Sequence, residues 1–393
     1  MKILIVSELF YPKLRGGEVV LWRIAQALAR RGHDVVVVTS RSSDTAAHET
    51  VNGVEIHRPH LLATQGMSNS LAMAVGKLRF MRKLYRYLDQ WVAVSGVDLI
   101  YNNAYTVTLP CGRLGRRHGI PVVTNIGNLQ GTGHRESTGW WPIGWVQQWK
   151  EWIILRYGGH RAIRVASEAV ARHIRPMTRA GVHVIPSPID AEAARAARES
   201  VDRQVIRAET DLDDDELLLL FVGALEPVKN VDAIIDVVSR IKRSVKLLVV
   251  GTGREEPRLR AQVERLGIAE RITFLGAQPH DRVLELMAAA DALLLASKSE
   301  NLPTVVLEAL SVGTPVVSTD VGGVREISSR NLTVVNSVEG IREVIEQGTP
   351  RYGDWSVLEN YSTDAIAEQF ERMFETVVAR ASESVHKREG QAK

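Results

Sequence analysis

Residues 292–317, ALLLASKSENLPTVVLEALSVGTPVV, decide the fold that this sequence predicts. The segment opens with an apolar run of strand length, and a second such run begins at Pro315. A polar loop and a predicted helix that starts near Pro303 lie between the two runs. Strand, loop, helix and strand in this order form the parallel unit of an α/β domain.

Two glutamates frame the predicted helix. Glu300 lies in the loop after the first strand, at the carboxyl end where open α/β sheets bind ligands. Pro303 is expected in the first helical turn, where its fixed φ is suitable and its missing N–H costs nothing. The N–H groups of residues 302–305 can then face an anion, and Glu308 follows one to two turns later. Carboxylates that accept from hydroxyls, beside N–H groups that bind phosphate, suit a sugar nucleotide.

The pattern S-x-x-E-N-L-P-x-V-V-L-E-A-x-x-x-G-x-P-V-V in residues 297–317 resembles the donor-site signature of the family-four retaining glycosyltransferases. The resemblance implies the GT-B fold, in which two Rossmann-like, doubly wound parallel-sheet domains face a cleft. It also implies that Glu300 lies beside the donor sugar and that Glu308 accepts from the ribose hydroxyls. The structural alternative is a helix-capping Glu300 and a solvated Glu308, and the length of the match favours the functional interpretation.

Length and composition bound the remaining possibilities. The chain has 393 residues, 45% hydrophobic and 24% charged, as expected of a globular protein of two domains. Its formal charge of +3 gives no reason to expect a nucleic-acid partner. Cys111 is the single cysteine, which excludes an intramolecular disulfide and a cysteine-built metal site. No signal-peptide region or membrane-spanning run is evident, so we expect a cytoplasmic protein.

The N-terminal half begins with a βαβ pattern. An apolar strand at residues 3–6 is followed by Gly16 and Gly17, a helix to about residue 31 and a strand at residues 35–39. The glycine pair lets the backbone approach a ligand closely, although it could equally be a loop hinge. The patterns F-x-P-x-x-x-G-G-x and R-G-H-D-V-x-V-x-T resemble the opening of the same family, where this loop lines the cleft near the donor phosphate and the acceptor.

A polar loop after the strand at residues 121–124 is the predicted acceptor side. The family commonly has an active-site histidine at the position of Ile126, so no histidine contact to the sugar can be transferred here. Asn125, Asn128 and His134 are the candidates for polar contacts, and the sequence does not choose among them.

Two segments raise the question of a membrane surface. In the predicted helix at residues 71–91, one face carries Leu78, Met81, Leu84, Tyr85 and Leu88, and another carries Arg79, Arg82, Lys83 and Arg86. A basic amphipathic helix can bind an anionic membrane, but a solvated surface helix is the favoured interpretation. Between residues 140 and 152, Trp145, Trp149 and Trp152 recur at helical spacing. A packed helix seam and a lipid contact are equally compatible with them.

The C-terminal half supplies a phosphate-binding candidate. Residues 223–230, GALEPVKN, resemble the family pattern G-R-L-x-x-x-K-G, whose arginine and lysine bind the donor diphosphate. Lys229 matches, whereas Ala224 replaces the arginine, so either another basic residue substitutes or activity is weak. A solvated lysine beside a helix start is the structural alternative. The acidic residues between 211 and 215 are interpreted as a solvated turn, and we predict no metal.

The sequence therefore predicts an α/β protein with an acceptor-side domain at residues 1–190, a donor-binding domain at 191–363, and a crossing-back helix and polar tail at 364–393. The predicted function is transfer of a sugar from a nucleoside-diphosphate sugar to a hydroxyl of a glycan or lipid-linked acceptor, with retention and without a cofactor. A non-catalytic nucleotide-sugar-binding partner subunit and a nucleotide-sugar epimerase are the alternatives. Glu300 and Lys229 are the predicted catalytic residues, and the predicted donor contacts are Gly16, Gly17, Lys229, Gly251, Leu275, Gly276, Glu300, Leu302, Pro303, Thr304 and Glu308.

Overall fold

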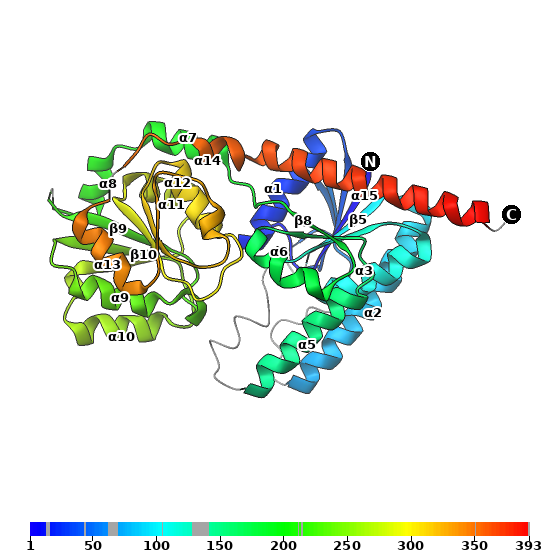
Figure 1. Ribbon diagram of the computed structural model, residues 1–393, viewed down its shortest axis with the longest axis horizontal. Coiled ribbons are helices and arrows are strands. Elements are labelled where there is room, and N and C mark those ends of the chain that lie inside the picture. The colour runs from blue at the N-terminus through cyan, green and yellow to red at the C-terminus, as the bar shows by residue number, and fades with distance from the viewer. Residues whose placement is uncertain are drawn as a thin grey trace. The chain divides into compact units, whose positions relative to one another are not determined.

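The computed structural model in Figure 1 describes residues 1–12, 16–42, 45–61, 70–103, 105–127, 141–210, 212–213, 215–349 and 351–391. The chain divides into two compact units. Unit 1 consists of Met1–Gln130, Trp145–Pro188 and Thr363–Lys393, and unit 2 consists of Gly131–Gly144 and Ile189–Ser362. Each unit is built around one predominantly parallel sheet with helices on its faces.

The sheet of unit 1 has the order β3-β4-β2-β1-β5-β6-β7-β8 among the described residues. All neighbouring strands are parallel except β3 and β4, which form an antiparallel hairpin at one edge. The strands are β1 (Lys2–Ser7), β2 (Asp34–Val38), β3 (His48–Val51), β4 (Val54–His57), β5 (Leu99–Asn103), β6 (Val122–Asn125), β7 (Ala162–Val165) and β8 (Gly181–Val184).

Helices cover both faces of this sheet, which is why its central strands are apolar without interruption. In β1, Ile3 and Ile5 pack into one core, and Leu4 and Val6 pack into the other. The helices of unit 1 are α1 (Gly16–Arg30), α2 (Ser70–Ser95), α3 (Tyr105–His118), α5 (Trp141–Tyr157), α6 (Glu168–Ile174), the 3₁₀ turn η1 (Arg175–Met177) and α15 (Thr363–Gln391). The first core receives α1 and α15, and the second receives α2 and α3.

The C-terminal helix α15 packs against α1 within unit 1. Phe370 and Phe374 lie in the core beside Tyr101, with ring centroids 5.7 and 5.6 Å from the tyrosine ring. At the surface, Arg31 of the α1 end binds Glu371 at 2.5 Å, and this hydrogen bond holds the pKa of Glu371 below its ordinary value. The polar residues 382–393 were predicted to form a tail, whereas the helix continues to Gln391.

The sheet of unit 2 is parallel throughout, with the order β11-β10-β9-β12-β13-β14. Its strands are β9 (Leu217–Val222), β10 (Val245–Val250), β11 (Ile272–Gly276), β12 (Ala292–Leu295), β13 (Val316–Thr319) and β14 (Leu332–Val335). Its helices are α7 (Ala191–Ser200), α8 (Arg203–Glu209), η2 (Pro227–Lys229), α9 (Val231–Arg240), α10 (Glu256–Leu266), η3 (Ala269–Arg271), α11 (His280–Ala289), α12 (Thr304–Ser311), η4 (Val324–Glu326), α13 (Val338–Gln347) and α14 (Ser356–Asn360).

The predicted strand, loop, helix and strand of residues 292–317 are present as β12, α12 and β13, and β12 pairs with β13 in parallel. Among the described residues, no helix combines the length and the apolar character that a membrane crossing requires.

Phe374→Ala tests how strongly α15 contributes to unit 1. The side chain is fully buried, so its removal leaves a cavity and should lower the free energy of unfolding by about 3–5 kcal/mol. Amide hydrogen exchange in β1 and β5 under increasing urea reports the stability of this unit.

Arg372→Ala is the matched control, because Arg372 lies two residues away and only its exposed ion pair with Glu368 at 2.9 Å is lost. It should cost about 0.5 kcal/mol or less. An equal effect of both substitutions would show that the buried ring contributes no more than the helix surface.

Candidate active site

Lys229 and Glu300 meet at the carboxyl ends of two neighbouring strands of unit 2. Lys229 ends η2 after β9, and Glu300 lies in the loop after β12, the strand that pairs with β9. The lysine Nζ lies 2.6 Å from the glutamate Oε1, and the two side chains are 25% and 11% exposed. The two predicted catalytic side chains thus form a half-buried ion pair in which each neutralises the other.

Backbone and amide contacts hold the two loops together. Asn230 has a left-handed backbone with φ of 55°, and its Nδ2 donates to the Ala296 carbonyl at 3.1 Å. The Lys298 N–H donates to the Val228 carbonyl at 2.8 Å. Because these bonds flank Lys229 on one loop and lie two to four residues before Glu300 on the other, the backbone holds the two loops at the spacing of the ion pair.

A glycine pair supports the Glu300 loop from its other side. Gly322 has φ of 56°, and a Cβ built on it would lie 2.4 Å from the Glu300 carbonyl oxygen. The Gly323 N–H donates to the Asn301 carbonyl at 2.7 Å. Both the backbone angle and the close approach therefore require glycine at position 322.

Helix α12 begins one residue later than expected. Pro303 is the N-cap, with φ of −70° and an extended ψ of 111°, and Thr304 is the first helical residue. The expectation of Pro303 within the first turn is therefore wrong, because its ψ lies outside the helical range. Leu302 is buried, whereas Thr304 is half-buried at the helix start.

Glu308 lies in the second turn of α12 and has a partner that sequence reasoning missed. His280, the first residue of α11, places its Nε2 4.0 Å from Glu308 Oε1. The glutamate side chain is 15% exposed and the histidine 38% exposed. His280 follows Pro279 directly in the sequence, and that pattern alone does not indicate that Glu308 lies nearby.

The glycines predicted to border the nucleotide lie where β9, β10 and β11 end. Gly251 has φ of 127°, its N–H donates to the Gly276 carbonyl at 2.7 Å, and Gly276 has φ of 67°. A Cβ on Gly251 would lie 2.0 Å from the Gly223 carbonyl oxygen. Three loops therefore converge through backbone contacts at one edge of the sheet. Leu275 is half-buried, and its carbonyl accepts from Gln278 Nε2 at 2.7 Å.

A neighbouring serine is buried without a partner. The Ser297 side-chain oxygen, two residues after the end of β12, has no hydrogen-bond partner among the described residues. Buried polar groups are nearly always paired, so an orphaned hydroxyl in this loop is typical of a site that binds a ligand or water. Its place in the S-x-x-E pattern was the signal available from sequence.

In unit 1, the predicted acceptor-side residue Asn125 belongs to a chain of hydrogen bonds at the carboxyl ends of β5, β6 and β7. Its Nδ2 donates to Asn103 Oδ1 at 2.6 Å, and its Oδ1 accepts from Arg164 at 2.9 Å. Arg164 is fully buried, and its guanidinium lies over the Phe370 ring. Asn125 is therefore held in one orientation by buried Arg164 and half-buried Asn103.

Ile126 and Gly17, two other residues of unit 1 identified from the sequence, lie in different surroundings. Ile126 is fully buried in a core with Leu155 and Ile163, so its side chain is a packing group. Gly17 lies at the start of α1, directly after Gly16, and no described atom lies within 4 Å of where its Cβ would be. Asn128 and His134 lie outside the described residues.

Two family models match adjoining parts of the chain. Residues 14–193 match the model described as Glycosyltransferase Family 4, and residues 202–333 match the one described as Glycosyl transferases group 1. The chain belongs to the family-four glycosyltransferases. This is a retaining family of enzymes that use nucleotide-sugar donors.

Individual relatives agree with this assignment. An uncharacterized glycosyltransferase of Methanocaldococcus jannaschii is 24% identical, with 98% of each chain covered. Sucrose-phosphate synthase from Thermosynechococcus elongatus has a TM-score of 0.80 at 18% identity, covering 97% of this chain and 100% of that one. Anabaena HepE in complex with UDP-glucose has a TM-score of 0.66 at 20% identity, covering 98% and 100%. These likenesses confirm the predicted GT-B fold of two Rossmann-like domains.

Gly322→Ala tests whether the glycine pair holds the Glu300 loop. Alanine is strained at this φ and its Cβ meets backbone atoms, so a loss of about 1–3 kcal/mol from the stability of unit 2 is expected, with faster amide exchange at residues 297–303. Gly353→Ala is the control, because no atom of the described residues lies within 4 Å of a Cβ there. Exchange in residues 297–303 that stays at the wild-type rate in Gly322→Ala would contradict the supporting role.

Proposed function

We propose that this protein transfers a sugar from a nucleoside-diphosphate sugar to a hydroxyl acceptor, and that unit 2 binds the donor. The observation that carries the proposal is the Lys229–Glu300 pair at the carboxyl ends of β9 and β12, with α12 and Glu308 following directly. An ammonium group and a helix start suit the diphosphate, and the carboxylates suit sugar hydroxyls. HepE has been seen with UDP-glucose, which makes UDP-glucose the first donor to test.

In the proposed mechanism, Lys229 neutralises charge that develops on the leaving diphosphate. The ammonium donates to Glu300 Oε1 at 2.6 Å, so the donor diphosphate would compete with that carboxylate for it. Two negatively charged phosphates compete well against one carboxylate at the same distance. Glu300, once released, can accept hydrogen bonds from the sugar, while Glu308 holds the ribose hydroxyls.

Arg254 is the residue we propose in place of the missing arginine at Ala224. Its loop is bound to the loop of Ala224, because the Leu225 N–H donates to the Thr252 carbonyl and the Glu255 N–H to the Leu225 carbonyl, each at 3.0 Å. The Arg254 side chain is 69% exposed and binds Glu226 at 2.9 Å. An exposed guanidinium on the adjacent loop can turn toward a diphosphate at little cost.

Glu300→Ala and Glu308→Ala should separate transfer from binding. Glu300→Ala removes the competitor for Lys229, so affinity for UDP should stay equal or rise while turnover of UDP-glucose falls about 100-fold or more. Glu308→Ala should weaken UDP binding about tenfold, because charged hydrogen bonds to ribose are lost. Calorimetric titration with UDP and release of UDP from UDP-glucose measure the two effects.

Glu264→Ala is the matched control, since this glutamate is exposed on α10 and should change neither quantity. Arg254→Gln should lower UDP affinity if it is the second cation. Binding of UDP with no turnover in the presence of any hydroxyl acceptor would favour the non-catalytic partner subunit. Conversion of the donor sugar without an acceptor would favour the epimerase. If Glu300→Ala retained wild-type turnover, the catalytic role of this residue would be wrong.

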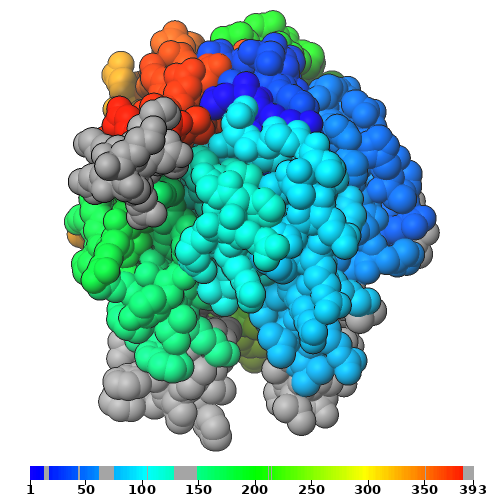
Figure 2. Space-filling model, turned by 90° about the vertical axis from the view of Figure 1, so that its right-hand side faces the viewer, coloured from blue at the N-terminus to red at the C-terminus, as the bar shows by residue number. Residues whose placement is uncertain are grey.

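We also propose that unit 1 contacts an anionic membrane where α2 and α5 reach the same end of the unit, as Figures 1 and 2 show. Trp149 and Trp152 of α5 are 63% and 38% exposed, and the Trp152 ring meets the Tyr157 ring edge to face at 5.9 Å, so both rings present apolar surface to solvent. On α2 the buried face is Phe80, Leu84, Leu88 and Val92, whereas Leu78, expected on the apolar face, is 65% exposed. The basic residues Arg79, Arg82, Lys83 and Arg86 are all exposed. Exposed aromatic and basic groups together are typical of interfacial contact, and they fit an acceptor carried on a lipid.

Co-sedimentation with vesicles tests this contact. Wild-type protein should bind vesicles that contain anionic lipid and bind neutral vesicles weakly, since each basic residue near the surface contributes about 1 kcal/mol. Changing Arg79, Arg82, Lys83 and Arg86 to Gln should remove most of the binding, and Trp149→Ala with Trp152→Ala should reduce it. Binding that does not depend on these six side chains would exclude this surface.

A further inference from the structure

The β3–β4 hairpin at the sheet edge of unit 1 brings together two histidines and a glutamate. The strands are joined through Asn52 and Gly53, which both have positive φ, as a two-residue hairpin turn requires. The register places His48 directly opposite His57. Glu55 precedes His57 by two residues, so its side chain lies on the same face of the strand.

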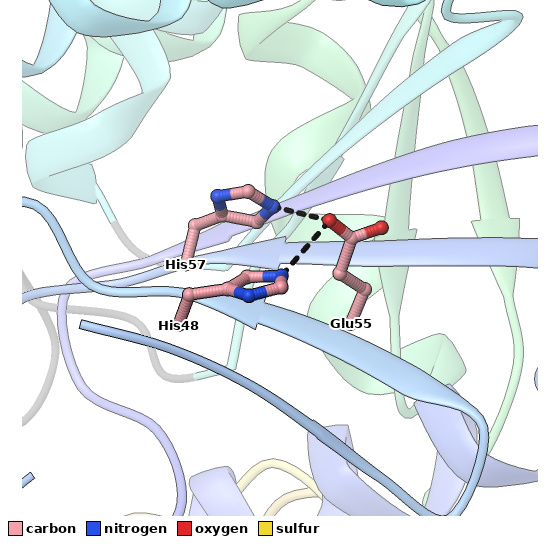
Figure 3. Close-up of side chains that lie close together, drawn as sticks. All are labelled: His48, Glu55 and His57. Atoms are coloured by element: carbon pink, nitrogen blue, oxygen red, sulfur yellow. Dashed lines mark hydrogen bonds and ion pairs between the residues drawn. The ribbon is translucent and has the colours of Figure 1, made fainter. Parts of the chain in front are cut away.

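The three side chains converge on one carboxylate oxygen (Figure 3). Glu55 Oε1 lies 2.6 Å from His57 Nε2 and 3.1 Å from His48 Nε2. One ligand atom from each residue lies within 4.8 Å of the other two. The side chains are 19% exposed at His57, 37% at Glu55 and 55% at His48, so the cluster is open to solvent on one side.

These distances are close to those of a metal site. Zinc binds imidazole nitrogen and carboxylate oxygen at about 2.0–2.2 Å, so tetrahedral ligand atoms lie about 3.3–3.4 Å apart. The His48–Glu55 distance is already near this value, and the His57–Glu55 distance needs to widen by less than about 1 Å. Side-chain rotation can supply such a change, because His48 lies on the edge strand β3 and its side chain is 55% exposed.

Residues of α2 support the inner histidine. The Tyr87 hydroxyl lies 3.3 Å from His57 Nδ1, and the Trp91 ring meets the His57 ring edge to face at 5.8 Å. A histidine that binds metal through Nε2 carries its proton on Nδ1. A tyrosine hydroxyl can accept the hydrogen bond that this Nδ1–H donates. The structure thus supplies the outer partner that metal-binding histidines usually have.

The opposite face of the hairpin has a different role. Glu49, next to His48 in the chain, pairs with buried Arg58 at 2.5 Å. A carboxylate and a cation on that face neutralise each other, whereas two imidazoles and one carboxylate on the other face leave lone pairs for a cation.

We propose that His48, Glu55 and His57 bind a divalent transition-metal ion of the zinc type, with water in the remaining position. Two imidazoles and a carboxylate suit zinc far better than magnesium, which prefers oxygen ligands alone. The ion would link β3 to β4 and so fasten the edge strand, which has a neighbour on one side only. The sequence analysis predicted no metal. The pattern His-x6-Glu-x-His forms a cluster only because the hairpin register places His48 opposite His57.

Calorimetric titration of the full chain, freed of metal with a chelator, tests the proposal with Zn²⁺ as the probe and Mg²⁺ as the comparison. One Zn²⁺ per chain should bind with a dissociation constant of about 1 µM or tighter. His48→Asn, Glu55→Gln and His57→Asn should each weaken binding about tenfold or more. Co²⁺ in place of Zn²⁺ should give a visible absorption band that these variants lose.

His60→Asn is the matched control, because His60 is exposed just after β4 and is not part of the cluster. It should bind Zn²⁺ like wild type. Circular dichroism checks that each variant is folded, which is expected because the side chains lie at an open edge. Absence of Zn²⁺ binding, or binding unchanged in both His48→Asn and His57→Asn, would overturn the proposal and leave a cluster held by hydrogen bonds alone.

Discussion

Burial of both faces of each parallel sheet is the constraint on which the rest of this structure depends. In β12 every side chain of Ala292–Leu295 is buried, so the strand itself can carry no functional group. Polar groups are then confined to the points where strands end, and the carboxyl ends of parallel strands share one edge. Lys229 and Glu300, 71 positions apart in the chain, meet at 2.6 Å for this reason.

That constraint explains which features could be predicted from the sequence. The adjacency of Glu300 and Lys229 follows from parallel strands that end together. The strand pattern of residues 292–317 can be recognised from the sequence alone. The His280–Glu308 approach and the His48–Glu55–His57 cluster could not be predicted, because they depend on helix packing and on hairpin register. The length of α15 was missed because its last turns are polar, and the apolar pattern ends before the helix does.

Four residues with positive φ lie around the candidate donor site. Asn230, Gly251, Gly276 and Gly322 all have positive φ and lie in loops at the carboxyl edge of the unit 2 sheet. Glycine adopts such angles without strain, whereas asparagine does so less readily, and here backbone hydrogen bonds or close approaches hold these positions. The loops that border the site are therefore determined by their own geometry, which is what a preorganised phosphate pocket requires.

The two departures from the family pattern, Ile126 and Ala224, differ in how readily another residue can supply the missing contact. Ile126 is a core residue, so its side chain cannot be exchanged for a sugar contact without repacking Leu155 and Ile163. Ala224 is exposed beside a loop that carries the exposed Arg254, so the proposed replacement for the lost charge is nearby. Phosphate recognition tolerates such relocation, because Coulomb attraction to a diphosphate depends on distance more than on the direction of approach. Hydrogen bonding to a sugar hydroxyl is directional and does not tolerate it. The contact that a histidine makes elsewhere in the family must therefore come, in this protein, from a residue other than Ile126.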